Sequence, residues 1–255
     1  MAELPEALFS NPVWHALHGP HRHLAIVEGS ACRYPADVCP FAAIAAPAGR
    51  ALDELRLLLA PDESVWIVDY GRTAPGLNVV DALDCVQMVL PADVEPSPQS
   101  GEVLPLAAAN AHEMVALTDV AFPGFFRSKT YRMGSYCGVR VDGQLVAMGG
   151  ERLRLEGYPE LSGICTHPAH RGKGLAKDLI GHLVRRHRRE GLRSWLHVGA
   201  PNTRAIDLYT SLGFKRVRTL MLHRIVGPQG VFAIAPDEAL TERIRARGPG
   251  ASATY

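Results

Sequence analysis

The chain has 255 residues, 47% of them hydrophobic and 21% charged, which is typical of a soluble globular protein and enough for one large domain or two modest ones. Its 27 basic and 26 acidic residues give a net charge of +1, so no overall field indicates nucleic acid or an anionic membrane as a partner. The five cysteines include no C-x-x-C pair, which favours a reduced protein over a disulfide framework or a zinc site.

The N-terminal segment gives no sign of export or of metal binding. Residues 1–6 carry two acids and a proline where a signal peptide carries basic residues, and no apolar run approaches the ~20 residues of a membrane span. We therefore expect a cytoplasmic protein without membrane contact. His15, His18, His21 and His23 lie close together in a predicted loop, but no acid or cysteine stands at ligand spacing, so we expect no metal.

The first part of the chain indicates an α/β lobe without a catalytic motif. Residues 51–59 predict an amphipathic helix, and residues 63–70 and 84–90 predict strands because they are rich in Val, Ile, Trp and Met. The stretch 91–101, rich in proline, serine and acids, is typical of a linker. These features predict an N-terminal domain over residues 1–98.

The second part predicts a longer alternation of helices and strands, in a domain of residues 99–226. In chain order we predict a helix at 107–118, a hairpin at 138–147 with its turn at Asp142-Gly143, a strand at 160–166, a helix at 174–189, a strand at 194–198, a helix at 202–212 ended by Gly213, and one strand or a strand pair at 214–223. Residues 227–255 predict a partly disordered tail with a short helix at 237–247.

The segment Arg171-Gly172-Lys173-Gly174-Leu175-Ala176 leads into the predicted helix 174–189. Its two glycines permit a turn that points successive backbone N–H groups into one concavity, and the helix start adds unpaired N–H groups and a positive dipole end. Arg171 and Lys173 add full charges, so the segment suits a pyrophosphate. Its spacing matches neither the dinucleotide fingerprint nor the Walker loop.

Two motifs together resemble a known family. Arg171-x-x-Gly174-x-Ala176, following Thr166-His167-Pro168, is similar to the coenzyme-binding segment of the GCN5-related N-acetyltransferases. Residues 202–209, followed by Leu212-Gly213-Phe214, are similar to a later helix of that family and its exit. The resemblance covers residues 103–224 and is closest to the FR47-like branch, through segments 142–147 and 149–153.

The resemblance implies a mixed α/β fold of the N-acyltransferase type. Residues 11–14 also resemble bacterial members of that branch, in which the first lobe is a degenerate copy of the same fold without the phosphate loop. This chain likewise has no second R-x-x-G-x-G/A motif before residue 100. We therefore expect a catalytic C-terminal lobe preceded by a degenerate N-terminal lobe.

The resemblance also implies an activity and a set of site residues. We expect acetyl-CoA or a related acyl-CoA as co-substrate, and direct attack by a primary amine, in a small molecule or a peptide, in a ternary complex. The coenzyme-binding residues that it implies are Ile164, Cys165, Thr166, the whole segment from Arg171 to Ala176, Asn202 and Tyr209. Asn202 after Pro201 is also a good helix N-cap, and both roles are compatible.

Acyl transfer to an amine needs a base, an oxyanion donor and a proton for the leaving thiolate. Tyr209 is the implied acid, although its helical spacing from Ala205 and Leu212 also fits a core aromatic. Glu160, six positions before Thr166, is the implied base, with Glu151 or a water as alternatives. Backbone N–H groups at 164–166 are the expected oxyanion donors. We interpret Cys165 as a small buried hydrophobe and not as a nucleophile.

Two functions of other classes stay open. One is an acyl-CoA-binding regulatory module without turnover. The other is a nucleic-acid-binding protein that uses the basic run 185–189, although cations in the last turn of a helix also favour its dipole. The segment 122–126 falls where the family walls the acceptor site, and its aromatic rings either line that site or pack under the loop. The acceptor, the acyl chain length and the oligomeric state, monomer or homodimer, stay open as well.

Overall fold

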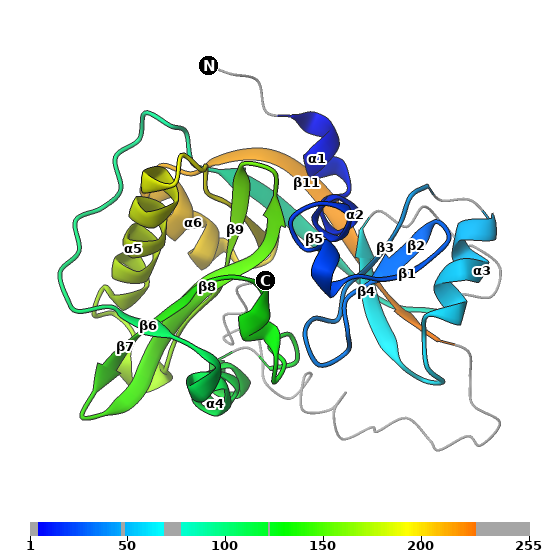
Figure 1. The fold of residues 1–255 in the computed structure, drawn as a ribbon. Helices are drawn as coiled ribbons and strands as arrows, with labels where there is room; N and C mark the ends of the chain where they lie inside the picture. The colour runs from blue at the N-terminus through cyan, green and yellow to red at the C-terminus, as the bar shows by residue number, and fades with distance from the viewer. Residues whose placement is uncertain (1–4, 47–48, 69–77, 122, 228–255) are drawn as a thin grey trace.

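The N-terminal part of the chain folds into short elements and one small sheet. A computed structural model describes residues 5–46, 49–68, 78–121 and 123–227 (Figure 1). The elements of this part are α1 (Glu6–Ser10), α2 (Pro12–His18), the 3-10 helix η1 (Arg22–Leu24), β1 (Ile26–Glu28), β2 (Ala31–Arg33), β3 (Ala42–Ile44), α3 (Gly49–Leu57), β4 (Ser64–Val68) and β5 (Asn78–Val89). Strands β1, β2 and β3 form an antiparallel sheet of three.

The rest of the described chain alternates longer strands and helices. Its elements are β6 (Leu104–Leu106), η2 (Ala108–Asn110), α4 (Ala111–Ala121), η3 (Thr130–Met133), β7 (Tyr136–Val141), β8 (Gln144–Leu155), β9 (Tyr158–Thr166), η4 (Pro168–His170), α5 (Leu175–Arg189), β10 (Trp195–Gly199), α6 (Thr203–Ser211) and β11 (Lys215–Val226). The β7–β8 hairpin turns at Asp142, at φ 50°, and Gly143, at φ 79°, as a type I′ turn requires.

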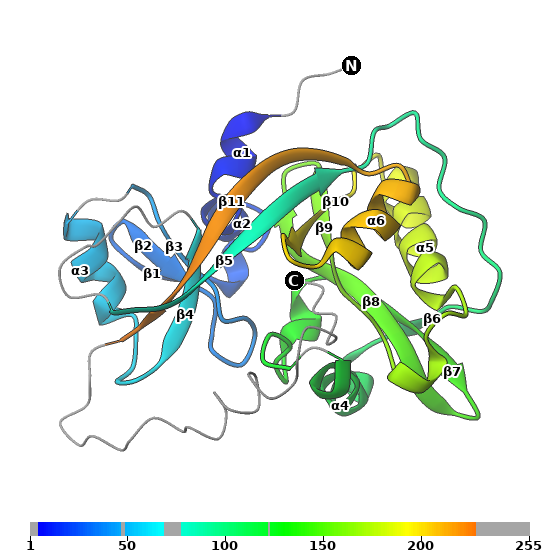
Figure 2. The same ribbon diagram turned by 180° about the vertical axis from the view of Figure 1, so that it is seen from behind.

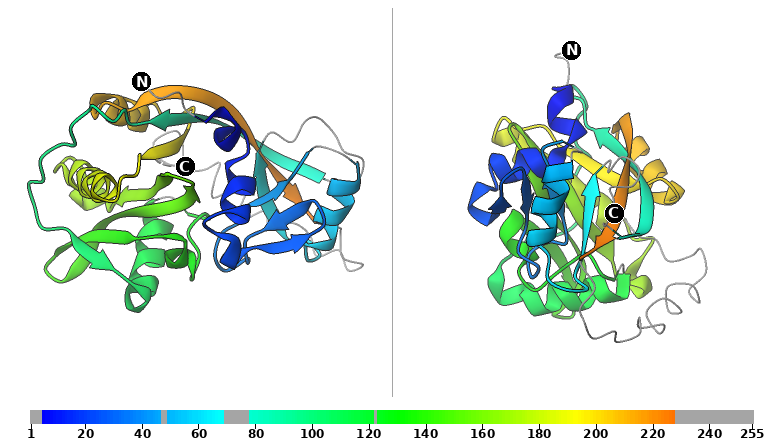
Figure 3. Two further views of the ribbon diagram at one scale, coloured as in Figure 1. Left: turned by 45° about the horizontal axis from the view of Figure 1, so that its top comes forward. Right: turned by 90° about the vertical axis from the view of Figure 1, so that its right-hand side faces the viewer.

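One sheet of eight strands runs through the described molecule. Its order is β4-β11-β5-β10-β9-β8-β7-β6, and only β9 and β10 are parallel neighbours. Strands β5 and β11, each of twelve residues, pair along their length and arch from the α5–α6 side of the molecule to the α3 side (Figure 2). The arch therefore joins the two lobes through backbone hydrogen bonds, and the left view of Figure 3 shows the arch from another side.

The two faces of the sheet around β8 and β9 bury different helices. Successive side chains of a strand point to opposite faces. Ala147 of β8 belongs to the apolar cluster that contains α5 and α6, whereas the next residue, Met148, belongs to the cluster that contains α4. Helix α5 buries an apolar stripe formed by Leu179, Ile180, Leu183 and Val184. Helices α5 and α6 thus cover one face of the sheet, and α4 covers the other.

The predicted mixed α/β architecture is confirmed. Most predicted boundaries shift by a few residues, but β8 continues to Leu155, beyond the predicted hairpin end at residue 147, and α1, β1, β2, β3 and β6 were not predicted. The predicted strand 84–90 is the end of the longer β5, and the region 214–223 forms one strand, β11. Of the four histidines predicted in a loop, His15 and His18 lie in α2 and His23 in η1, where the prediction is wrong, whereas His21 lies in a turn. The end of the predicted strand 63–70, Phe122 and the tail from residue 228 lie outside the described residues.

The predicted boundary between residues 98 and 99 stays a prediction. Strand β5 lies on its N-terminal side but pairs with β10 and β11 on the other side. The segment 91–101 packs along α5, where Ser100 N–H donates to Asp178 Oδ1 at 2.8 Å and Arg185 donates to Ser97 O. The region of the predicted linker is thus tied to the second lobe.

Candidate active site

A fork in the large sheet opens the candidate site. Strands β9 and β10 pair at only two positions, Trp195 with Glu160 and Leu196 with Leu161. Beyond Leu161, strand β9 continues to Thr166 beside β8, and no described strand pairs with it on the β10 side. Backbone groups of residues 162–166 on that side are therefore available to a ligand.

The turn before α5 forms one end of the site. Gly172 and Gly174 take φ values of 78° and 80°, which glycine adopts without the steric cost of a Cβ. Gly174 is the N-cap of α5 and makes no side-chain cap hydrogen bond, so the N–H groups of the first helical turn stay free for an anion. The predicted phosphate loop therefore has the backbone conformation that such a loop needs.

A pocket of about 390 Å³ lies between the fork, this turn and α6. Its walls come from α4, β9, the α5 start and α6, and the lining residues are Ala121, Ile164, Cys165, Thr166, His170, Arg171, Gly172, Gly174, Leu175, Ala176, Lys177, Arg204, Ala205, Leu208 and Tyr209. This volume is in the range of small-molecule sites.

The chemistry of the lining fits an anionic, phosphate-bearing ligand. Arg171, Lys177 and Arg204 contribute three cationic side chains, and the lining contains no Asp or Glu. His170 also lines the pocket, and its buried Nδ1 has no hydrogen-bond partner among the described residues.

Most of the predicted coenzyme-binding residues meet in this pocket. Lys173 and Asn202 are outside the lining, and Asn202 instead caps α6 by accepting a hydrogen bond from Ala205 N–H at 3.1 Å. Lys177 and Arg204 also line the pocket and were not predicted as site residues, although Arg204 lies within the motif 202–209 and Lys177 directly follows the segment 171–176. Their positions in the first turns of the two predicted helices were the available signal.

Tyr209 lies at the buried end of the pocket. Its side chain is 2% exposed and packs edge-to-face against Phe214, with 5.8 Å between ring centroids. Burial raises the pKa of the phenol, the charge of Glu160 raises it further, and that of Arg152 lowers it. The phenol therefore stays protonated at neutral pH, which suits a proton donor.

Glu160 is fully buried and does not line the pocket. Its Oε1 accepts from Arg152 Nη2 and from His197 Nδ1, both at 2.7 Å, and its Oε2 accepts from Arg152 Nε and Leu153 N–H. Burial alone would raise the pKa of this carboxyl, but Arg152 and His197 hold it well below the ordinary value. A carboxylate in this ion pair is a weak base and has no direct path to an amine.

Glu151, the other predicted base, faces the opposite side of β8. Its Oε1 lies 3.1 Å from His187 Nε2, whose Nδ1 lies 2.8 Å from Ser194 Oγ, and all three side chains are buried. This carboxylate is also absent from the pocket lining. It ties β8 to the C-terminal half of α5.

The remaining predicted features have structural partners. Burial raises the pKa of Cys165 to about 12, so the thiol is protonated at neutral pH and is a poor nucleophile. Phe125 stacks on Trp66 and Phe126 packs against Tyr136, so both rings pack within the protein.

In the basic run 185–189, Arg186 pairs with Glu190 and Arg188 pairs with Glu95. No described helix is long and apolar enough to cross a membrane.

Known proteins are similar to this chain in sequence and in fold. Residues 109–214 match the acetyltransferase (GNAT) family. A protein from Novosphingobium aromaticivorans DSM 12444, assigned to the GNAT family, has a solved structure and is 36% identical; the match covers 87% of this chain and 99% of that chain, with a TM-score of 0.79. Among proteins with curated functions, none matches the sequence.

Two more distant structures share the fold. A GCN5-related N-acetyltransferase from Kribbella flavida is 20% identical, over 85% of this chain and 94% of that chain, with a TM-score of 0.56. A GCN5-related N-acetyltransferase-like protein from Streptococcus suis 89/1591 is 14% identical, over 88% of this chain and 94% of that chain, with a TM-score of 0.55. All three matches cover most of both chains, so the similarity includes both lobes.

Proposed function

The chain belongs to the GNAT family of acetyltransferases, and from this premise we propose that it transfers an acetyl group from acetyl-CoA to a primary amine. The observation that carries the proposal is the pocket at the β9–β10 fork. It combines a glycine turn at a helix N-terminus, three cations without a lining carboxylate, and a protonated tyrosine at its buried end. The pyrophosphate would bind at Arg171 to Ala176, and the thioester would lie beside Tyr209.

The reaction forms an N–C bond and breaks the C–S bond of the thioester. Tyr209 donates its phenolic proton to the departing thiolate and then regains one from solvent. Backbone N–H groups on the free side of β9, at residues 164–166, stabilise the negative charge on the carbonyl oxygen during attack. The amine attacks directly, because the protonated Cys165 is unsuited to form an acyl-enzyme.

The amine must lose a proton before it attacks, since an alkylammonium has a pKa of about 10.4 and no free lone pair. Neither Glu160 nor Glu151 lines the pocket, so we propose water as the proton acceptor. Glu160 then acts through its ion pair with Arg152, which holds β8 and β9 in register at the fork. It is a positioning residue in this account and not a base.

A module that binds acyl-CoA without turnover is the second candidate, favoured by the lack of a lining carboxylate. Thiol release from acetyl-CoA, followed over a panel of primary amines, distinguishes the two. Amine-dependent release supports the transferase. Saturable acetyl-CoA binding without release for any amine supports the binding module.

A further inference from the structure

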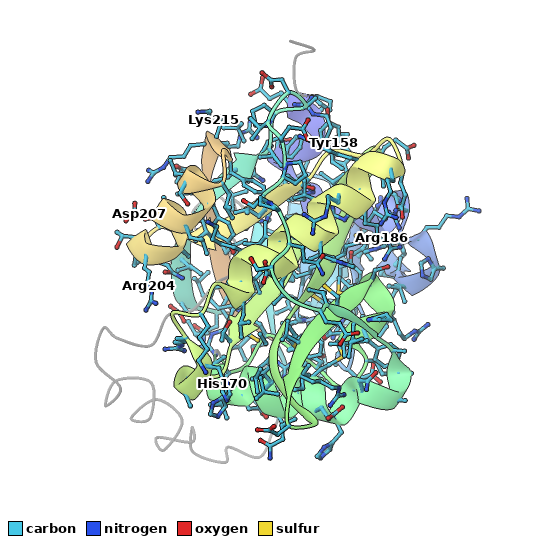
Figure 4. All side chains as sticks on the ribbon, turned by 90° about the vertical axis from the view of Figure 1, so that its left-hand side faces the viewer. Tyr158, His170, Arg186, Arg204, Asp207 and Lys215 are labelled. Carbon is cyan, nitrogen blue, oxygen red and sulfur yellow. The ribbon has the colours of Figure 1, made fainter. Side chains whose placement is uncertain are left out.

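The pocket has a buried end and an exposed rim. Ala121, Cys165 and Tyr209 are buried at one end, whereas Lys177 and Arg204 are exposed at the other. Arg204 precedes Tyr209 by five residues on α6, about 7.5 Å along the helix axis at 1.5 Å per residue. Figure 4 shows Arg204 at the end of α6 nearer His170, with Lys215 at the opposite end of the helix.

This gradient sets the direction of a bound coenzyme. If the thioester lies beside Tyr209 and the pyrophosphate at the glycine turn, the adenosine end must extend to the rim. That end of coenzyme A carries a 3′-phosphate, a phosphomonoester with about −1.5 to −2 charges at neutral pH. A group with that charge needs cationic partners, and the lining of the pocket contains no Asp or Glu that would repel it.

The rim supplies two such partners from different elements. Lys177 extends from the first turn of α5 and Arg204 from the first turn of α6, and neither is in an ion pair with a described residue. Arg171, by contrast, already donates from Nε towards Thr166 O at 3.4 Å and belongs to the pyrophosphate turn. The fork of an arginine side chain matches phosphate oxygens in two parallel hydrogen bonds.

We propose that Arg204, assisted by Lys177, binds the 3′-phosphate of coenzyme A and makes the protein select coenzyme A over its 3′-dephospho form. This inference rests on the proposed function, because it needs an acyl-CoA in the pocket. It assigns a specificity role to two residues outside the phosphate loop. It also predicts that discrimination against 3′-dephospho-CoA is lost separately from catalysis.

Titration calorimetry with coenzyme A and 3′-dephospho-CoA tests the proposal without any acceptor amine. The unaltered protein should bind coenzyme A at least about tenfold more tightly, which corresponds to about 1.4 kcal/mol. Arg204→Gln should weaken coenzyme A binding by about tenfold and leave 3′-dephospho-CoA binding unchanged. Lys177→Gln should also weaken coenzyme A binding, by a smaller factor, and leave 3′-dephospho-CoA binding unchanged.

Lys215→Gln is the matched control, since it removes one exposed positive charge outside the pocket. It should change neither affinity by more than about twofold, because a distant exposed charge is largely screened by salt. Equal affinities of the unaltered protein for both ligands would overturn the 3′-phosphate assignment and leave the transferase proposal standing. An Arg204→Gln variant that weakens both ligands equally would overturn it too. Binding of neither ligand would instead contradict the proposed function itself.

Discussion

At the scale of single residues, the proposed role of Tyr209 as the proton donor depends on its hydroxyl group. Tyr209→Phe keeps the ring and its packing against Phe214 and removes only the hydroxyl. We expect kcat with acetyl-CoA and an accepted amine to fall by about 10²–10⁴. The affinity for coenzyme A should stay unchanged, as calorimetry can verify. Unchanged turnover in this variant would show that the thiolate leaves without help from Tyr209.

The buried ion pair of Glu160 with Arg152 gives a prediction about stability. Glu160→Gln leaves the Arg152 guanidinium buried without its counter-charge, which typically destabilises a fold by about 3–5 kcal/mol. The double variant Arg152→Met, Glu160→Gln should recover most of that loss, because it removes both charges. Chemical unfolding of the two variants measures the difference. Full stability of the single variant would contradict the ion-pair assignment.

The same ion pair makes the free energy of unfolding depend on pH. The pKa of Glu160 is lower in the folded chain than in the unfolded chain, so its stabilisation is complete above the unfolded value of about 4.3. As the pH falls below that value, the unfolded state takes up the proton first and the stabilisation is lost. The unfolding free energies of the unaltered protein and of Glu160→Gln should therefore converge from about pH 4 downwards. A constant difference over that range would contradict the assignment.

At the scale of elements, the glycine turn before α5 is the most testable part of the site. Gly174→Ala places a Cβ in open space but at a φ of 80°, so the loop must change conformation or carry about 1–2 kcal/mol of strain. We expect about a tenfold loss of coenzyme A affinity, since 1.4 kcal/mol is tenfold in binding. Gly191→Ala is the matched control, because Gly191 has a φ of 72°, also faces open space and lies beyond the other end of α5. It should lower stability by a similar amount and leave the affinity unchanged. Loss of affinity in both variants would point to a global effect of strain.

The loop after α4 is fixed by the N-terminal lobe through Thr130. Its Oγ1 donates to Val38 O at 2.6 Å and accepts from Arg127 N–H at 2.7 Å. Thr130→Val should cost about 1–3 kcal/mol in unfolding free energy, because both backbone groups lose their partner. Thr118 Oγ1 donates to Val115 O within its own helix, so Thr118→Val should lower the unfolding free energy by a smaller amount. Equal losses of unfolding free energy in the two variants would indicate that the contact between the lobes contributes nothing to stability.

The elements of the second lobe could be predicted because their signals are local. The apolar stripe of α5, the Asp142-Gly143 turn and the glycines before the helix each lie within a short window of sequence. The face on which Glu160 lies could not be predicted. Alternation along a strand says which residues share a face, but not which face meets the coenzyme. The ion pair with Arg152 depends on β8–β9 register, which no local pattern encodes.

At the scale of the whole molecule, the pairing of β5 with β11 was the least predictable feature. Their partners are more than a hundred residues apart in the sequence, and the predicted strand 84–90 showed only the half of β5 that is buried. The exposed half, from Asn78, carries no apolar alternation that would mark it as a strand. The resulting arch makes the two lobes share a sheet, so we expect them to unfold together.

Ligand binding should stabilise this whole unit. A ligand at a hundred times its dissociation constant adds about 2.7 kcal/mol to the free energy of unfolding. For a chain of this size, the melting temperature should rise by roughly 5–10 °C with saturating acetyl-CoA. Adenosine alone, without the pyrophosphate, should give a much smaller rise. A protein that saturating acetyl-CoA does not stabilise would contradict the assignment of the pocket.

The central claim is that the pocket at the fork catalyses acyl transfer, and thiol release measures it most directly. Release of coenzyme A thiol from acetyl-CoA should depend on the added amine, increase with pH as the amine loses its proton, and fall by about 10²–10⁴ in Tyr209→Phe. If the protein binds acetyl-CoA but no amine in a broad panel accelerates thiol release, the claim is contradicted.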